Sequence, residues 1–110
     1  MYAKVYQYKF PSITEAKIAA SFCADNLSKY IIEYNFKSLN IMIGQCGSLS
    51  IIIKFDKSEN LRDYERNSKT FINELKKGFT FKEDQYAGVY VYNYEAEATS
   101  SEIKITNPAA

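Results

Sequence analysis

The sequence contains no histidine and no tryptophan, and only two cysteines, four glycines and two prolines among its 110 residues. Histidine is the commonest general base and metal ligand of proteins, so its absence argues against zinc sites and against catalysis by an imidazole. Cys23 and Cys46 form no C-x-x-C pair and have no histidine with which to complete a metal site. We therefore expect no metal, no cofactor, and free thiols in a reducing compartment.

An excess of one charge is also missing, because 14 Lys and Arg residues face 13 Asp and Glu residues for a net charge of +1. Proteins that bind duplex nucleic acid or an anionic membrane usually carry an excess of positive charge, which this sequence does not have. No apolar run reaches the roughly 18 residues that cross a bilayer. The first residues, MYAKVYQYKF, alternate and do not resemble a secretory signal. The sequence predicts a soluble cytoplasmic protein with no nucleic acid or membrane partner.

What is present suits one domain with its own core, since 46% of the residues are hydrophobic. Alternation over residues 2–10 predicts a strand. Ser12 and Glu15 then form the S-x-x-E pattern of a helix N-terminus. Apolar residues recur at helical spacing as far as Tyr34, which predicts a helix of about five turns.

The middle of the chain predicts a hairpin followed by a second helix. Two strand-like runs, 36–45 and 48–55, meet at a turn in which Gly47 supplies the positive φ. Residues from Ser58 onward show helical spacing again, and Gly78 is the expected left-handed residue at the end of that helix.

A last strand is predicted from about residue 85 to residue 95, which gives the element order βαββαβ. The simplest fold for this order is α+β and ferredoxin-like: a four-stranded antiparallel sheet with two helices on one face. The predicted domain spans residues 1–95, and residues 96–110 form a tail in which Ile103 and Ile105 suggest a short docking strand.

The strands divide into an aliphatic face and an aromatic face. We place the helices on the aliphatic face, which includes Ala3, Val5, Leu39, Ile51, Ile53 and Val89. Seven of the ten tyrosines lie in the first and last strands, on the other face. An apolar surface of this kind usually marks an interface, and tyrosine suits one. We therefore predict a homodimer with Tyr6, Tyr8, Tyr90 and Tyr92 at the interface.

An RNA-recognition motif has the same element order and stacks bases on aromatic residues of its open sheet. In this sequence the corresponding strand reads SLSIIIKF, and its outward residues are Ser50, Ile52 and Lys54. This strand offers no aromatic platform, which argues against RNA binding.

The stretch SIIIKFDKSENLRDY resembles the dimeric α/β-barrel superfamily, and in particular proteins of the antibiotic biosynthesis monooxygenase type. In that family the third strand ends in Trp, and Leu and His follow on the second helix. The matching positions hold Phe55, Leu61 and Tyr64. The resemblance covers about residues 2–95, and it implies a homodimer that packs sheet to sheet.

The same resemblance implies a ligand cleft between the helices and the sheet. The candidate ligand-binding residues are then Gln7, Phe55 and Tyr64. Each also suits an ordinary structural role: Phe55 and Tyr64 could fill the core, and Gln7 could lie near the edge of the sheet or form a local hydrogen bond. Haem degradation, which some relatives perform, is not expected because no histidine is present to bind iron.

These observations lead to two functional hypotheses. The first is a homodimer that binds a small hydrophobic or aromatic molecule, with cofactor-independent monooxygenase activity on a quinol-like compound as its enzymatic form. The second is a non-catalytic structural or regulatory dimer whose cleft is filled by side chains. No catalytic residue can be assigned from the sequence, so whether the protein is an enzyme stays open.

Overall fold

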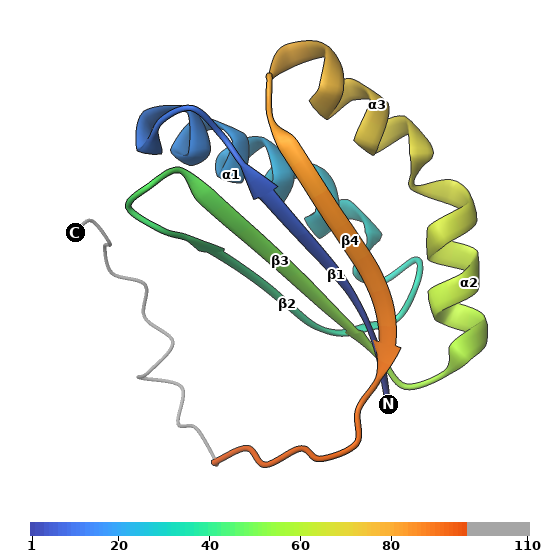
Figure 1. Cartoon of the computed structure of the whole chain (residues 1–110). Coiled ribbons are helices and arrows are strands. Elements are labelled where there is room, and N and C mark those ends of the chain that lie inside the picture. The colour runs from blue at the N-terminus through green and yellow to red at the C-terminus, as the bar shows by residue number, and fades with distance from the viewer. Residues whose placement is uncertain (97–110) are drawn as a thin grey trace.

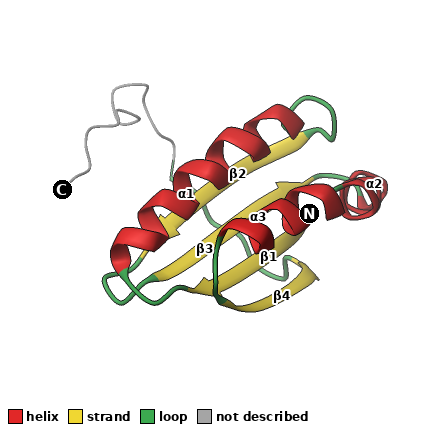
Figure 2. Cartoon of the chain, turned by 90° about the horizontal axis from the view of Figure 1, so that it is seen from above, coloured by secondary structure: helices red, strands yellow, loops and turns green. Residues whose placement is uncertain are grey.

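A computed structural model describes residues 1–96 and shows one four-stranded antiparallel sheet with its helices on one face (Figures 1 and 2). The strand order is β2-β3-β1-β4, so the predicted α+β ferredoxin-like fold is confirmed. The elements are β1 (Tyr2–Lys9), α1 (Ile13–Leu27), a 3-10 helix (Ser28–Tyr30), β2 (Phe36–Ile43), β3 (Ser48–Phe55), α2 (Ser58–Asn67), α3 (Lys69–Gly78) and β4 (Lys82–Val89). Within residues 1–96 no helix is long and apolar enough to cross a membrane.

The first helix begins where the sequence predicts and ends earlier. The Ser12 hydroxyl accepts a hydrogen bond from the Glu15 backbone N–H at 3.3 Å, which caps the N-terminus of α1. The helix ends at Leu27, whereas the prediction continued to Tyr34. A 3-10 helix and turns follow, and Asn35 adopts a φ of 54°, a conformation that asparagine tolerates better than most residues.

The predicted second helix is broken into α2 and α3 at Ser68. This residue is buried, has φ −96° and ψ 3°, and donates its hydroxyl hydrogen to the Glu65 carbonyl at 3.5 Å. Such a bond from a serine side chain to a nearby backbone carbonyl competes with the helical pattern and bends helices. The bend lets α2 contact β1 and β3 while α3 contacts α1.

The two glycines expected at special positions behave differently. Gly47 has a φ of 92°, and its carbonyl accepts a hydrogen bond from the Phe10 N–H at 2.9 Å. The predicted hairpin glycine is therefore confirmed. The prediction for Gly78 is wrong, because its φ is not positive and α3 ends with Phe79 in an extended conformation.

The largest correction concerns the faces of β1. Tyr6 and Tyr8 are 1% and 3% exposed and lie beneath the helices, paired in register with Ile51 and Leu49. The prediction placed them on the open face and is wrong. The reason is packing: α1 lies over β2 and β3, whereas β1 lies against α2, where the Tyr6 hydroxyl meets that of Tyr64 at 2.9 Å, so large rings fill the space above β1.

The last strand also differs from its prediction. It spans Lys82–Val89 rather than 85–95, because its partner β1 begins at Tyr2, which pairs with Val89. One further hydrogen bond joins the Tyr90 N–H to the Met1 carbonyl at 3.0 Å, after which no β1 residue is left to pair. The predicted docking strand at Ile103 and Ile105 lies outside the described residues.

The two cysteines should differ in reactivity. Cys23 is fully buried, and burial raises the pKa of its thiol to about 12, so the reactive thiolate is scarce at neutral pH. Cys46 is exposed in the β2–β3 turn. We expect a thiol reagent such as DTNB to modify one thiol in the folded protein and both in denaturant. The variant Cys46→Ser should then show almost no reaction when folded, and rapid reaction of Cys23 in this variant would contradict the buried environment.

Candidate functional site

The ligand cleft implied by the resemblance is filled by aromatic side chains. Phe55 and Tyr64 are both 0% exposed and their ring centroids lie 5.8 Å apart. The Tyr64 ring also packs edge to face against Phe36, Tyr30 and Tyr34, with centroids 5.5–6.1 Å away. Gln7 is exposed on the opposite face of the sheet, next to Ser50. The structure therefore unites Phe55 and Tyr64 but separates both from Gln7.

The hydroxyl groups of Tyr6 and Tyr64 form a buried hydrogen bond of 2.9 Å. Burial raises the pKa of both phenols, and for Tyr64 the proximity of Tyr6 raises the pKa further. Both groups therefore stay protonated at physiological pH. This buried pair holds α2 against β1.

Tyr8 is also part of this interior and not of an interface. The centre of its ring lies 4.9 Å from that of Phe81 and 5.8 Å from that of Tyr6, on which it stacks. The Tyr8 hydroxyl finds no hydrogen-bond partner among the described residues, and burial raises its pKa. An unsatisfied buried hydroxyl lowers the stability of the fold, so the contribution of Tyr8 to stability must come from the packing of its ring.

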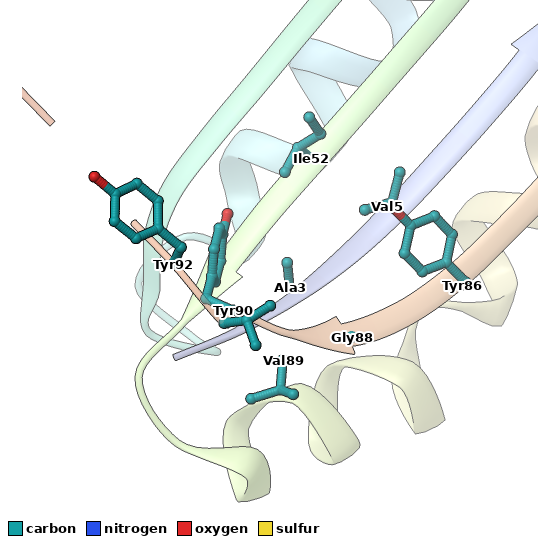
Figure 3. Close-up of a pocket in the computed structure, with 9 residues that line it drawn as sticks. Ala3, Val5, Ile52, Tyr86, Gly88, Val89, Tyr90 and Tyr92 are labelled. Atoms are coloured by element: carbon teal, nitrogen blue, oxygen red, sulfur yellow. The ribbon is translucent and has the colours of Figure 1, made fainter. Parts of the chain in front are cut away.

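The face of the sheet opposite the helices carries a hollow of about 330 Å³ (Figure 3). Its floor is formed by small and aliphatic side chains, Ala3 and Val5 of β1 and Ile52 of β3. Residues from β4 and from the chain after it form the walls: Tyr86, Gly88, Val89, Tyr90, Val91 and Tyr92. Tyr86 stands beside Val5, its partner in register. The hollow is therefore predominantly apolar.

A buried lysine holds the segment after β4 against this face. The Lys54 side chain is only 8% exposed, and its ammonium donates to Glu95 Oε2 at 2.8 Å. The same ammonium lies 5.2 Å from the centre of the Tyr90 ring, within the range of a cation–π interaction. The hydrogen bond to Glu95 raises the pKa of Lys54. Sequence reasoning missed this pair, since its members are 41 residues apart.

Several large apolar side chains around the hollow remain in contact with solvent. Tyr86 is 59% exposed, Tyr92 is 84% exposed and Val91 is 96% exposed. Met42 on β2 is 62% exposed and lies farther along the same face, beside Ser50. Toward the other end of the same face lie polar residues, namely Gln7, Ser50 and Asp84, whereas Asn40 stands beside Ile52 at the hollow. The open face thus has an apolar part around the hollow and a mostly polar part at its other end.

Comparisons with known proteins bear on the fold. No family model matches the sequence, and neither does any curated protein. The structure is similar to the crystal structure of a dimeric ferredoxin-like protein from an uncultured marine organism. The two share 17% sequence identity with a TM-score of 0.70, over 87% of this chain and 100% of the other. What this likeness shows is a ferredoxin-like fold, and it does not extend to the antibiotic biosynthesis monooxygenase family.

Proposed function

We propose that this chain acts as a non-catalytic homodimer, structural or regulatory, that packs sheet to sheet through its open face. The observation that carries the proposal is the exposed apolar cluster of Tyr86, Val91 and Tyr92 around the hollow floored by Ile52. Contiguous apolar surface of this kind marks an interaction site in a soluble protein. Tyrosine is enriched at such interfaces.

A second copy of the chain is the partner that best fits this face. The similar marine protein is described as dimeric, and its entire length aligns with this chain. Two copies can pack their apolar parts against each other about a twofold axis. The net charge of only +1 adds little repulsion between copies.

The composition of the proposed interface differs from the sequence prediction. Tyr90 and Tyr92 keep their proposed place because both line the open-face hollow. Tyr6 and Tyr8 are replaced by Tyr86 and Ile52, since the former pair is buried beneath the helices.

Monooxygenase activity on an aromatic or quinol-like compound has less support. The positions that correspond to the family residues, Phe55, Leu61 and Tyr64, all belong to the packed core. A substrate there would have to displace several aromatic rings. Losing the packing of one large buried side chain usually costs about 3–5 kcal/mol, so this displacement would be strongly unfavourable. The filled cleft therefore favours the non-catalytic dimer.

A pair of matched variants tests the dimer. We expect the wild type to show twice its chain mass of 12.6 kDa by light scattering at micromolar concentration. Ile52→Lys should give the monomer mass, because it puts an ammonium at the centre of the apolar face. Ile18→Lys should remain dimeric, since Ile18 is 56% exposed on α1, away from the open face.

Circular dichroism must show that both variants are folded. A wild-type monomer at this concentration would contradict the proposal, as would an Ile52→Lys variant that is folded and still dimeric. Dissociation by Ile18→Lys alone would move the interface to the helical side.

A further inference from the structure

A polar groove lies on the helical side of the sheet, along β4. Figure 2 shows β4 at the side of the sheet beyond α3, with α1 over the opposite half. The groove has a volume of about 400 Å³. Its floor consists of Lys4, Tyr6 and Gln85, and its wall consists of Glu65, Ser68, Lys69, Ile72, Asn73 and Lys76. A groove of this size accommodates a small organic molecule.

The floor of the groove contains an ammonium group with hydrogen-bonding capacity to spare. The Lys4 side chain is 10% exposed, and its Nζ donates to Glu65 Oε2 at 2.9 Å. The Nζ also lies 5.5 Å from the centre of the Tyr6 ring. An ammonium has three donors, and Glu65 is the only acceptor that the described residues give it. An ammonium so far withdrawn from water favours a further hydrogen-bond acceptor for its remaining donors.

The wall adds positive charge at the rim. Lys69 is exposed and forms no ion pair within residues 1–96. The charge of Lys76 is partly offset by Glu83 on β4, whose Oε1 lies 3.4 Å from the Lys76 Nζ. Three ammonium groups thus line the groove, whereas Glu65 is the only carboxylate among its lining residues.

We propose that this groove binds a small organic anion, a carboxylate on a compact apolar body. Lys4 and Lys69 would pair with the carboxylate, and the amides of Gln85 and Asn73 would supply neutral hydrogen bonds. Ile72 and the Tyr6 ring offer apolar contact to the body of the ligand. The groove lies across the sheet from the proposed dimer face, so this inference is independent of the dimer.

The probe for this site is sodium benzoate, titrated into the ¹⁵N-labelled full chain at constant ionic strength. Benzamide serves as the neutral analogue, and sodium phosphate as an anion with no apolar body. We expect benzoate to shift the amide signals of Tyr6, Lys69 and Gln85 with saturation. Benzamide should bind at least about tenfold more weakly, the factor that corresponds to one lost charge-assisted hydrogen bond.

Charge-removing variants locate the site. Lys69→Gln and Lys4→Gln should each weaken benzoate binding by about tenfold. Lys17→Gln removes the same charge from an exposed position on α1 and should leave the affinity unchanged. Lys69→Gln is the more secure variant, because its side chain is exposed and the fold does not depend on it. The Ile52→Lys variant should bind benzoate as the wild type does, whatever its oligomeric state.

Three results would overturn the proposal. The first is equal binding of benzoate and benzamide, which would remove the role of the charge. The second is an equal effect of phosphate at the same signals, which would reduce the site to simple charge attraction. The third is a loss of affinity in Lys17→Gln as large as in Lys69→Gln, which would show that only net charge matters.

Discussion

Replacing Tyr64 with alanine is expected to lower the free energy of unfolding by about 3–5 kcal/mol, the usual cost of deleting a large buried aromatic ring. Tyr64 is fully buried at the junction of α2, β3 and the segment after α1. Its ring contacts four other aromatic rings, so the cavity cannot close without moving several elements. A domain of this size has only about 5–15 kcal/mol of total stability. Urea denaturation followed by circular dichroism measures the change.

The contribution of the hydroxyl group can be separated from that of the ring. Tyr64→Phe should cost about 1 kcal/mol, because it leaves the Tyr6 hydroxyl without its partner in the core. The double variant Tyr6→Phe with Tyr64→Phe should be less destabilised than the sum of the single variants, since it removes both polar groups. A double variant whose loss equals that sum would show that the two hydroxyls act independently. An Ala variant no less stable than the Phe variant would contradict the role of the ring.

The sequence was sufficient to predict most of the sheet. The hairpin β2–β3 follows from the alternation of Leu39, Ile41 and Ile43 and from Gly47, and the structure places all three aliphatic side chains on the helical face. These features are local: the pattern has one strongly apolar face, so a shift by one residue would expose it. Where one face is clearly apolar, period-two alternation decides the orientation of the strand.

The same reasoning failed for β1 because both of its faces are apolar. Ala3 and Val5 look like core residues, and Tyr6 and Tyr8 look like surface residues, yet the structure reverses them. What decides the orientation is the packing of β1 against α2, where Tyr6 meets Tyr64, and this is a property of the packed pair rather than of either segment. The orientation of such a strand therefore depends on the side chains of the helix that covers it.

The charged contacts of the two candidate surfaces could not be predicted at all. Lys54 pairs with Glu95, and Lys4 pairs with Glu65, 61 residues later in the sequence. Both lysines occupy strand positions that alternation assigns to solvent, and no local spacing shows that a carboxylate will reach them. Only the fold brings the partners together, so surfaces built on such pairs become visible once the strand order and register are known.

Replacing Gly47 with alanine is expected to destabilise the protein by about 2–4 kcal/mol, through strain at a positive φ and through a steric clash. The φ of Gly47 is 92°, and a Cβ atom there would lie 2.5 Å from the Phe10 carbonyl oxygen. That oxygen belongs to backbone and cannot rotate away. The Gly47 carbonyl also binds the Phe10 N–H, so a shift of the turn would break the link between the hairpin and the end of β1.

Gly78→Ala is the matched control for this prediction. A Cβ atom at Gly78 meets no atom within 4 Å, and its φ is not positive. Alanine favours a helix over glycine by up to about 1 kcal/mol, so at the end of α3 this variant should be neutral or slightly more stable. In urea denaturation, the midpoint of Gly47→Ala should therefore fall below that of the wild type. The midpoint of Gly78→Ala should stay the same or rise. Equal midpoints for the two variants would mean that the turn can relax around a side chain, and that the conformation of Gly47 does not determine the register of the hairpin against β1.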